Sequence, residues 1–294
     1  MTKNIFNNIE HTRQASLKNY NTYHVECIAE YLFQPNNETE LLEILKIIKE
    51  NNLKYLILGN GSNLILECEY FEGAVIKLNK LNSLEYNNYT VTVGAGYSLS
   101  KLALETIDKG MSGLEFAAGI PGLVGASTAM NAGAYNHDMS TIVKEVRLIT
   151  PNLEILSFTN SQMEYTYRDS FIKKNPEYII LSTTFELKPG NVDEMKQMVQ
   201  EKKIKRIASQ PLDLPNAGSV FRNPEGMYAG ELIEKLNLKG HNINGAEVSM
   251  KHANFIVNRG TARGKDIVEL INKIQKEVKH NYNVDLKLEQ IIIK

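Results

Sequence analysis

Residues 113–135 read GLEFAAGIPGLVGASTAMNAGAY, and this stretch decides the fold. It places glycine at positions 113, 119, 122, 125 and 133 and proline at 121, among many alanines. The stretch is too rich in small residues for an ordinary core and too apolar for an ordinary loop. It predicts a turn over residues 118–122 that leads into the start of a closely packed helix. The N–H groups and dipole at a helix start attract anions, although tight helix packing alone also explains the small residues.

A second glycine segment, GNGSNL at residues 59–64, follows the short apolar run 55–58. Its glycines allow the backbone to approach a pyrophosphate closely, and they equally suit a tight turn. A Rossmann fingerprint needs a helix directly after the glycines, whereas residues 64–66 continue as an apolar strand. No GxxxxGK[ST] pattern is present. The two glycine segments together suit the two sides of a long diphosphate cofactor.

The rest of the chain alternates helices and strands, which predicts an α+β fold. Apolar residues at 41, 42, 45 and 48 form one stripe of a helix over 38–52, and those at 267, 271, 274 and 278 form another stripe in a helix over 264–281. Further helices are expected between Ser98 and Gly110, at 192–207 and at 229–236. Strands are expected at 55–58, 74–78, 90–95, 143–149, 154–158, 178–187, 245–249, 254–258 and 284–292.

Composition narrows the class of protein. A chain of 294 residues with 43% apolar residues suggests two domains, or three small ones, with sizeable cores. The net charge of -1 excludes a general attraction to nucleic acid or to an anionic membrane. The sequence has no signal-peptide h-region, no long apolar run and only two cysteines, Cys27 and Cys68, so we expect a cytoplasmic protein without a disulfide framework. The six histidines show no metal-ligand spacing, and no metal site is expected.

The two glycine segments, extended by residues 130–135 and preceded by Asn21-Thr22, resemble the FAD-binding segments of the UDP-N-acetylenolpyruvoylglucosamine reductase (MurB) family, and the shorter type II branch in particular. The similarity covers nearly the whole chain in the right order. It implies a flavin fold of the vanillyl-alcohol-oxidase (PCMH) type, with FAD-binding subdomains at 1–80 and 81–190 and a C-terminal α+β substrate-binding domain at 191–294. The chain departs from the family pattern at Glu26-Cys27, at Ala126 and, near its end, at Gln290 and Lys294.

The resemblance implies noncovalent FAD, and it assigns the cofactor to residues of the two glycine segments. These residues are Gly59, Asn60, Gly61, Ser62, Asn63, Leu64, Ala118, Gly119, Ile120, Pro121, Gly122, Gly125, Ala126, Asn131, Ala132 and Gly133.

Three residues are candidates for catalysis. Ser219, in the segment AGSVFRNP at 217–224, is by itself a turn serine, and the resemblance makes it the proton donor. Arg168 alone suggests an ion pair, whereas the resemblance makes its guanidinium the group that stabilises charge on a carboxylate. Glu289 alone is a strand carboxylate, and it matches the catalytic glutamate near the C-terminus of the family. Substrate contacts are assigned to Tyr167, Arg222 and Asn223.

The resemblance implies an oxidoreductase of peptidoglycan precursor synthesis. NADPH reduces FAD, and the flavin then reduces UDP-N-acetylglucosamine enolpyruvate to UDP-N-acetylmuramate. No nucleic acid, membrane insertion or obligate protein partner is expected. Two alternatives stay open at this point: another flavin enzyme of the same superfamily, such as a hydroxy-acid or sugar-alcohol oxidase, and a UDP-sugar-binding sensor without catalytic activity.

Overall fold

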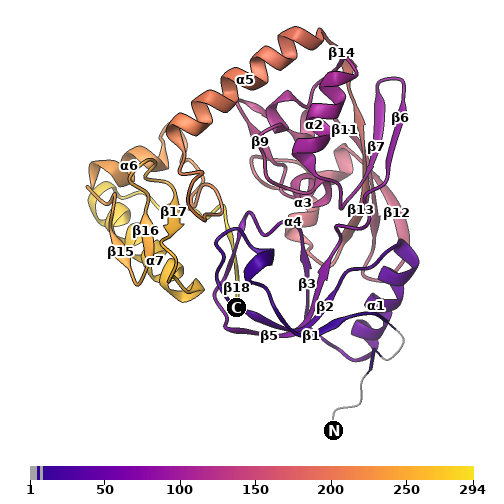
Figure 1. The fold of residues 1–294 in the computed structure, drawn as a ribbon, viewed down its shortest axis with the longest axis horizontal. Helices are drawn as coiled ribbons and strands as arrows, with labels where there is room; N and C mark the ends of the chain where they lie inside the picture. The colour runs from indigo at the N-terminus through magenta and orange to yellow at the C-terminus, as the bar shows by residue number, and fades with distance from the viewer. Residues whose placement is uncertain (1–4, 7–8) are drawn as a thin grey trace. The chain divides into compact units, whose positions relative to one another are not determined.

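Residues 5–6 and 9–294 are described by a computed structural model of the chain, drawn as a ribbon in Figure 1. These residues form two compact units. Unit 1 contains the described residues up to Arg13, together with residues 31–59 and 73–203. Unit 2 contains residues 14–30, 60–72 and 204–294. Each unit is therefore assembled from three separate stretches of the chain.

Unit 1 is built around a five-stranded antiparallel sheet with strand order β12-β11-β13-β7-β6. Alternate residues of its strands are buried, as in Val91 and Val93 of β7, because successive side chains of a strand point to opposite faces. Its strands are β6 (Leu84–Asn87), β7 (Thr90–Gly94), β11 (Val143–Ile149), β12 (Ile155–Thr159) and β13 (Ile179–Glu186). Two short pairs, β8 (Met111–Ser112) with β14 (Lys188–Pro189) and β9 (Gly133–Ala134) with β10 (His137–Asp138), complete the antiparallel pairing.

A second sheet has the order β1-β2-β5-β3. Its strands are β1 (Thr12–Ser16), β2 (Ile28–Phe33), β3 (Tyr55–Leu58) and β5 (Tyr70–Lys77). β3 and β5 run parallel, with Tyr55 opposite Ala74. The division between the two units falls within β1, β2 and β5, so these strands continue from one unit into the other.

The helices of unit 1 begin where the sequence supplies caps. Asn37 accepts a hydrogen bond from the Glu40 amide and opens α1 (Glu38–Glu50), and Ser98 accepts one from the Lys101 amide and opens α2 (Leu99–Asp108). The shorter helices are α3 (Val124–Ala129) and α4 (Phe171–Lys174), and the 3₁₀ turns of this unit span Glu115–Ala117, Met139–Thr141 and Ser161–Met163. The charged helix expected over residues 192–207 is α5 (Val192–Ser209), and Met195 is its only buried residue. It begins in unit 1 and ends in unit 2.

Unit 2 packs helices against a small antiparallel sheet of β15 (Asn242–Ile243), β16 (Ala246–Val248) and β17 (Ile256–Asn258). Its helices are α6 (Ala229–Lys235), α7 (Gly264–Tyr282) and the 3₁₀ turn Lys18–Tyr20. The predicted stripe of α7 is confirmed, because Ile267, Ile271, Ile274 and Val278 are at most 1% exposed. Apolar residues at this spacing lie on one helix face and can all be buried together.

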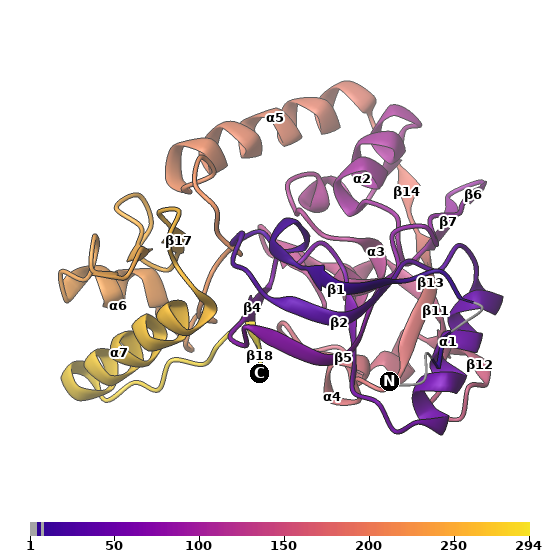
Figure 2. The ribbon, with the colours of Figure 1, turned by 60° about the horizontal axis from the view of Figure 1, so that its bottom comes forward.

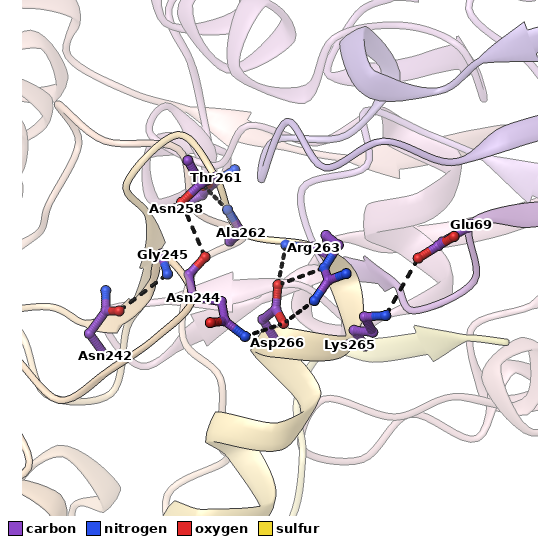
Figure 3. A network of polar contacts seen from close by, with 10 residues as sticks. All are labelled: Glu69, Asn242, Asn244, Gly245, Asn258, Thr261, Ala262, Arg263, Lys265 and Asp266. Atoms are coloured by element: carbon purple, nitrogen blue, oxygen red, sulfur yellow. Dashed lines mark hydrogen bonds and ion pairs between the residues drawn. The ribbon is translucent and has the colours of Figure 1, made fainter.

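α7 begins at a network of polar contacts that Figure 3 shows from close by. The amide of Arg263 donates to Asp266 over 2.8 Å, and the two side chains form an ion pair at 3.3 Å. Asn244 donates to the same carboxylate over 3.2 Å. Asp266 is almost fully buried, so these partners offset the cost of removing its charge from water.

The C-terminal segment differs from the expected strand over 284–292. The regular strand is β18 (Ile291–Ile293), which pairs in parallel with β4 (Leu64–Leu66), as Figure 2 shows. Before it, one isolated bridge joins Leu288 to Phe221. Local alternation predicts extended chain over these residues, but the available partner strands decide how much of it forms a ladder.

Two further features bear on the expected class of protein. No helix within residues 5–6 and 9–294 is both long enough and apolar enough to span a membrane. Cys27 and Cys68 are free cysteines whose Sγ atoms lie 3.5 Å apart.

The buried stripe of α7 generates a stability prediction. Replacing Ile271 by alanine removes a fully buried side chain, and we expect the free energy of unfolding to fall by about 2–5 kcal/mol. The matched control is Asn272→Ala, at the adjacent exposed position of the same helix, which should change it by less than about 0.5 kcal/mol. Urea titrations followed by circular dichroism measure both. Equal losses in the two variants would contradict the assigned stripe.

Candidate functional site

The second glycine segment lies against the end of β7 in unit 1. The amides of Val124 and Gly125 donate to the carbonyl groups of Tyr97 and Ala95, over 2.8 and 2.9 Å. A Cβ atom on Gly125 would lie 2.7 Å from the Cβ of Ala95, so glycine permits this contact. Close packing, one of the two explanations left open by the sequence, therefore accounts for Gly125. The first two amides of α3 are engaged within the protein.

Two amides of this segment, before the start of α3, have no partner within the described protein. Within the described residues, the N–H groups of Gly119 and Gly122 make no hydrogen bond. Gly119 is exposed, whereas Gly122 is buried, and a Cβ on Gly122 would lie 2.5 Å from Ser127 Oγ. The turn over residues 118–122, rather than the start of α3, thus has an exposed donor at Gly119 of the kind that binds a diphosphate.

The first glycine segment begins in unit 1, where it meets the second. A Cβ on Gly59 would lie 3.1 Å from the Cβ of Ala126, which places the first residue of this segment beside the second segment. Lys77 donates to the Gly59 carbonyl over 2.9 Å, and burial lowers the pKa of this lysine. Gly59 and Ala126, which are distant in sequence, thus lie side by side within unit 1.

The remainder of the first segment, residues 60–64, belongs to unit 2, where Asn21-Thr22 holds it. Gly61 has φ = +63°, and a Cβ there would lie 2.3 Å from the Tyr20 carbonyl oxygen. The amide of Thr22 donates to the Gly61 carbonyl over 3.2 Å. Asn21 is buried and donates to the carbonyl groups of Leu17 and Val25 over 2.8 and 2.9 Å. The motif therefore fixes the loop by its backbone.

Ser219 and Glu289 are brought together in unit 2 by backbone pairing. The amide of Glu289 donates to the carbonyl group of Val220, the residue after Ser219, over 2.9 Å. The amide of Arg222 donates to the Lys287 carbonyl, also over 2.9 Å. Ser219 and Glu289 are both half-buried. These two residues are far apart in the sequence, yet they lie on adjacent segments of unit 2.

Asn254 holds the same segment from its other side, and sequence reasoning did not identify it. Its side chain accepts from the Phe221 amide over 3.0 Å and donates to the Phe221 carbonyl over 2.8 Å. Its carbonyl accepts from the Val220 amide over 2.9 Å. The available signal was a buried asparagine within an otherwise apolar run, because such a residue needs polar partners.

The C-terminal segment also joins the first glycine segment within unit 2. The side chain of Asn63 donates to the Glu289 carbonyl over 3.2 Å, and the amide of Ile291 donates to the Asn63 carbonyl over 3.0 Å. Unit 2 therefore gathers residues 60–64, Ser219 and Glu289 into one connected region.

Arg168 belongs to unit 1, where the end of the second glycine segment orients it. Its guanidinium donates to the carbonyl groups of Gly133 and Asn131, and it lies 5.1 Å from the ring of Tyr167. Asn131 in turn donates to the Thr166 carbonyl over 2.9 Å. Arg168 has φ = +56°, a conformation that costs a non-glycine residue about 1–3 kcal/mol and that recurs at active sites and ligand clamps.

The predicted substrate contacts occupy different settings. Tyr167 is 51% exposed in unit 1. In unit 2, Arg222 is half-buried and Asn223 is exposed, and Asn223 Oδ1 accepts a hydrogen bond from the Ala229 amide at the start of α6 over 3.1 Å.

Two other kinds of site were considered. Within the described part of the chain, no three or more His, Cys, Asp or Glu side chains lie together so that they could hold a metal ion. Unit 2 contains a cavity of about 510 Å³ whose lining includes Asp213, Met250 and Arg259. None of the predicted site residues lines this cavity, so the candidate site rests on the contacts described above rather than on the cavity.

Two family models match the chain. The model described as "FAD binding domain" matches residues 29–159, and the model described as "UDP-N-acetylenolpyruvoylglucosamine reductase, C-terminal domain" matches residues 210–293. Both matches cover residues of the candidate site.

Relatives align over nearly the full length. The UDP-N-acetylenolpyruvoylglucosamine reductases of Clostridium novyi and Anoxybacillus flavithermus are 39% and 42% identical, over 94% and 97% of this chain and 90% and 93% of their own. The crystal structure of the Thermus caldophilus reductase is 31% identical, with a TM-score of 0.83, over 97% of this chain and 99% of its own. Cholesterol oxidase from B. sterolicum, 17% identical with a TM-score of 0.50 over 64% of this chain and 39% of its own, shares the fold. The α+β flavin fold is confirmed.

The close approach at Gly61 generates a prediction. Gly61→Ala should lower the free energy of unfolding by roughly 1–3 kcal/mol more than Gly226→Ala, because only the alanine at position 61 meets backbone atoms. Both glycines have positive φ, so the conformational strain is matched. Urea titration compares them, and similar losses would show that the approach of Tyr20 to Gly61 is not tight.

The setting of His252 generates a pH prediction. Burial, with the charge of Lys239, lowers its pKa from 6.5, and its Nδ1 accepts from the Asn254 amide over 3.2 Å. Between the folded and unfolded pKa values the unfolded chain binds more protons, so stability falls as pH decreases below 6.5. We therefore expect the wild type to be more stable than His252→Gln at pH 8, and this difference in unfolding free energy should shrink as the pH is lowered to 5. The exposed His280→Gln is the control, and a parallel pair of curves for His252→Gln would contradict the prediction.

Proposed function

Because the chain belongs to the UDP-N-acetylenolpyruvoylglucosamine reductase family, we propose that it reduces UDP-N-acetylglucosamine enolpyruvate to UDP-N-acetylmuramate with NADPH and enzyme-bound FAD. The observation that carries the proposal is the pairing of the Ser219 segment with the Glu289 segment, next to residues 60–64. The backbone pairing of these segments within one unit supports the assignment of the Ser219 hydroxyl and the Glu289 carboxyl group to one site. The product belongs to peptidoglycan precursor synthesis.

Residues of both glycine segments fit the cofactor. In unit 1, Gly59 lies against Ala126, and the amide of the exposed Gly119 is available for phosphate oxygens. In unit 2, residues 60–64 continue the same loop. We also assign Asn131, Ala132 and Gly133 to the cofactor region, although Asn131 and Gly133 hold Arg168 as well. When bound, FAD supplies the hydride chemistry, taking a hydride from NADPH and giving it to the enolpyruvyl group.

The chain's own residues then control charge and protonation. The guanidinium of Arg168 is permanently charged and matches a carboxylate, so we assign it to the negative charge that develops on the substrate. We assign Glu289 to the same charge as a carboxyl that donates a hydrogen bond, because an ionised carboxylate would repel an anion. Ser219 delivers the proton to the adjacent carbon. An alcohol is a weak acid, and it can serve only when its position is fixed, which the hydrogen bonds of its neighbours Val220 and Phe221 support.

We assign the UDP-sugar to Tyr167, Arg222 and Asn223. The side-chain oxygen of Asn223 already accepts a hydrogen bond from the Ala229 amide at the start of α6. We therefore assign its NH₂ group as a donor to the substrate. The division into residues 1–80, 81–190 and 191–294 also stays a prediction. We further propose a cytoplasmic location, since thiols that remain free at 3.5 Å suit a reducing compartment.

Purification and one assay test the activity. The protein should be yellow, and NADPH oxidation should accelerate when the enolpyruvyl UDP-sugar is added. A colourless protein that binds the UDP-sugar would instead indicate a sensor. Rapid oxygen consumption with a hydroxy acid would indicate an oxidase.

Ser219→Ala tests the proton donor. We expect turnover to fall by about 10² or more, by analogy with the loss of one transition-state donor. Flavin reduction by NADPH should stay near normal, because that half-reaction does not use the serine. Stopped-flow absorbance separates the two half-reactions. The control is Ser249→Ala. Ser249 is a buried turn serine of the same unit, and its hydroxyl oxygen accepts a hydrogen bond from the Lys251 amide. Equal losses in both half-reactions would contradict the assigned role.

A further inference from the structure

Gln290 is a buried side chain that directly contacts the backbone before Ser219. Its Nε2 donates to the carbonyl groups of Ala217 and Gly218, over 3.0 and 3.1 Å. Its Oε1 accepts from the hydroxyl of Tyr23 over 3.0 Å. Gln290 is 3% exposed and Tyr23 is fully buried. The carboxamide is therefore fully engaged in a setting without solvent, where each hydrogen bond is strong and its loss is costly.

The peptide units that Gln290 contacts lie on either side of Gly218, whose amide donates to Asn216 Oδ1 over 3.0 Å. Gly218 has φ = +78°, and no atom lies within 4 Å of the position a Cβ would take. No neighbouring atom therefore packs against Gly218 on the side where a side chain would lie. The backbone of glycine also rotates more freely than that of any other residue. The two hydrogen bonds from Gln290 fix the peptide carbonyls on either side of it. Asn254 fixes Val220 and Phe221 beyond Ser219, so the serine lies between two restrained points.

Tyr23 transmits this restraint from the start of α7. Asn258 is buried and donates to the Tyr23 carbonyl over 2.7 Å. Its Oδ1 accepts from the amides of Gly260 and Ala262, over 2.7 and 3.1 Å. Figure 3 shows Asn258 beside Ala262, close to the Arg263–Asp266 cap of α7. Both ends of Tyr23 are thus tied by hydrogen bonds, its carbonyl to Asn258 and its hydroxyl to Gln290.

We propose that Gln290, oriented by Tyr23, is a positioning residue that sets the placement of Ser219 for proton delivery. The proposal rests on the function proposed above. It gives a role to a position where the chain departs from its family pattern, and it is independent of how FAD is held.

The chemistry of the carboxamide makes the proposal testable through pH. A carboxylate at position 290 can accept from Tyr23 but cannot donate to the Ala217 and Gly218 carbonyls. Burial beside two carbonyl oxygens disfavours the charged form, so the pKa of an introduced carboxyl should lie above its ordinary value. Tyr23 stays protonated, because burial raises the pKa of its phenol. Once protonated, the introduced carboxyl regains one donor.

The experiment measures the two half-reactions by stopped-flow absorbance between pH 5.5 and 8.5, in the wild type, Gln290→Glu and Tyr23→Phe. At pH 8, Gln290→Glu should slow flavin oxidation by the enolpyruvyl UDP-sugar by about 10- to 100-fold, as expected for a misplaced catalytic group. Its deficit relative to wild type should shrink as pH falls. Tyr23→Phe, which removes one hydroxyl, should slow the same step without a pH-dependent recovery. Flavin reduction by NADPH should change by less than about twofold in both variants.

Gln275→Ala is the matched control. Gln275 Nε2 also donates to a backbone carbonyl of the C-terminal segment, that of Leu286, over 2.8 Å, and it does not contact the Ser219 turn. This variant should keep both half-reactions near the wild-type rates. Urea titration of all variants reports general destabilisation, and the flavin absorbance spectrum reports the cofactor environment.

Three outcomes would overturn the proposal: equal losses in both half-reactions, a pH-independent deficit in Gln290→Glu, or the same deficit in Gln275→Ala. If Gln290→Glu does not fold, a wild-type rate of flavin oxidation in Tyr23→Phe overturns it. A wild type that does not oxidise NADPH with the enolpyruvyl UDP-sugar would instead refute the proposed function, and a fully active Ser219→Ala would refute the role of the serine.

Discussion

The hydrogen bonds between residues 220–222 and 287–289 are the interaction on which the candidate site depends. The amide of Glu289 donates to the Val220 carbonyl, and the amide of Arg222 donates to the Lys287 carbonyl, so two segments far apart in sequence run side by side. Directly after Glu289 and Gln290, β18 pairs in parallel with β4, which begins at the last residue of the first glycine segment. One run of backbone bonds thus sets the spacing of Ser219, Glu289 and residues 60–64.

Glycine allows the two glycine segments to lie very close to neighbouring backbone and methyl groups. At Gly125 the neighbour is Ala95, at Gly61 it is the backbone of Tyr20, and at Gly59 it is Ala126. These contacts bring backbone against backbone or against a single methyl group. A loop that presents amides to a diphosphate needs support of this kind, because its own hydrogen bonds are not all made within the protein.

Buried carboxamides recur wherever the site must be held without charge. Asn21 supports the first glycine segment, Asn131 the Arg168 turn, and Asn254 and Gln290 the Ser219 segment. A carboxamide donates and accepts at the same time, and it avoids the desolvation cost of an ion.

The sequence by itself determined the glycine segments, the capped helices α1 and α2, the buried stripe of α7 and the family motifs at Arg168, Ser219 and Glu289. Each of these features depends on residues close together in the sequence, through periodicity, helix caps or a contiguous motif. Only the tertiary structure decided that Gly125 serves packing, that residues 284–290 form one bridge instead of a strand, and that Tyr23, Asn254 and Gln290 support the serine. The physical reason is that these features depend on partners brought together from distant parts of the chain. Local propensity cannot specify which carbonyl a buried amide will meet.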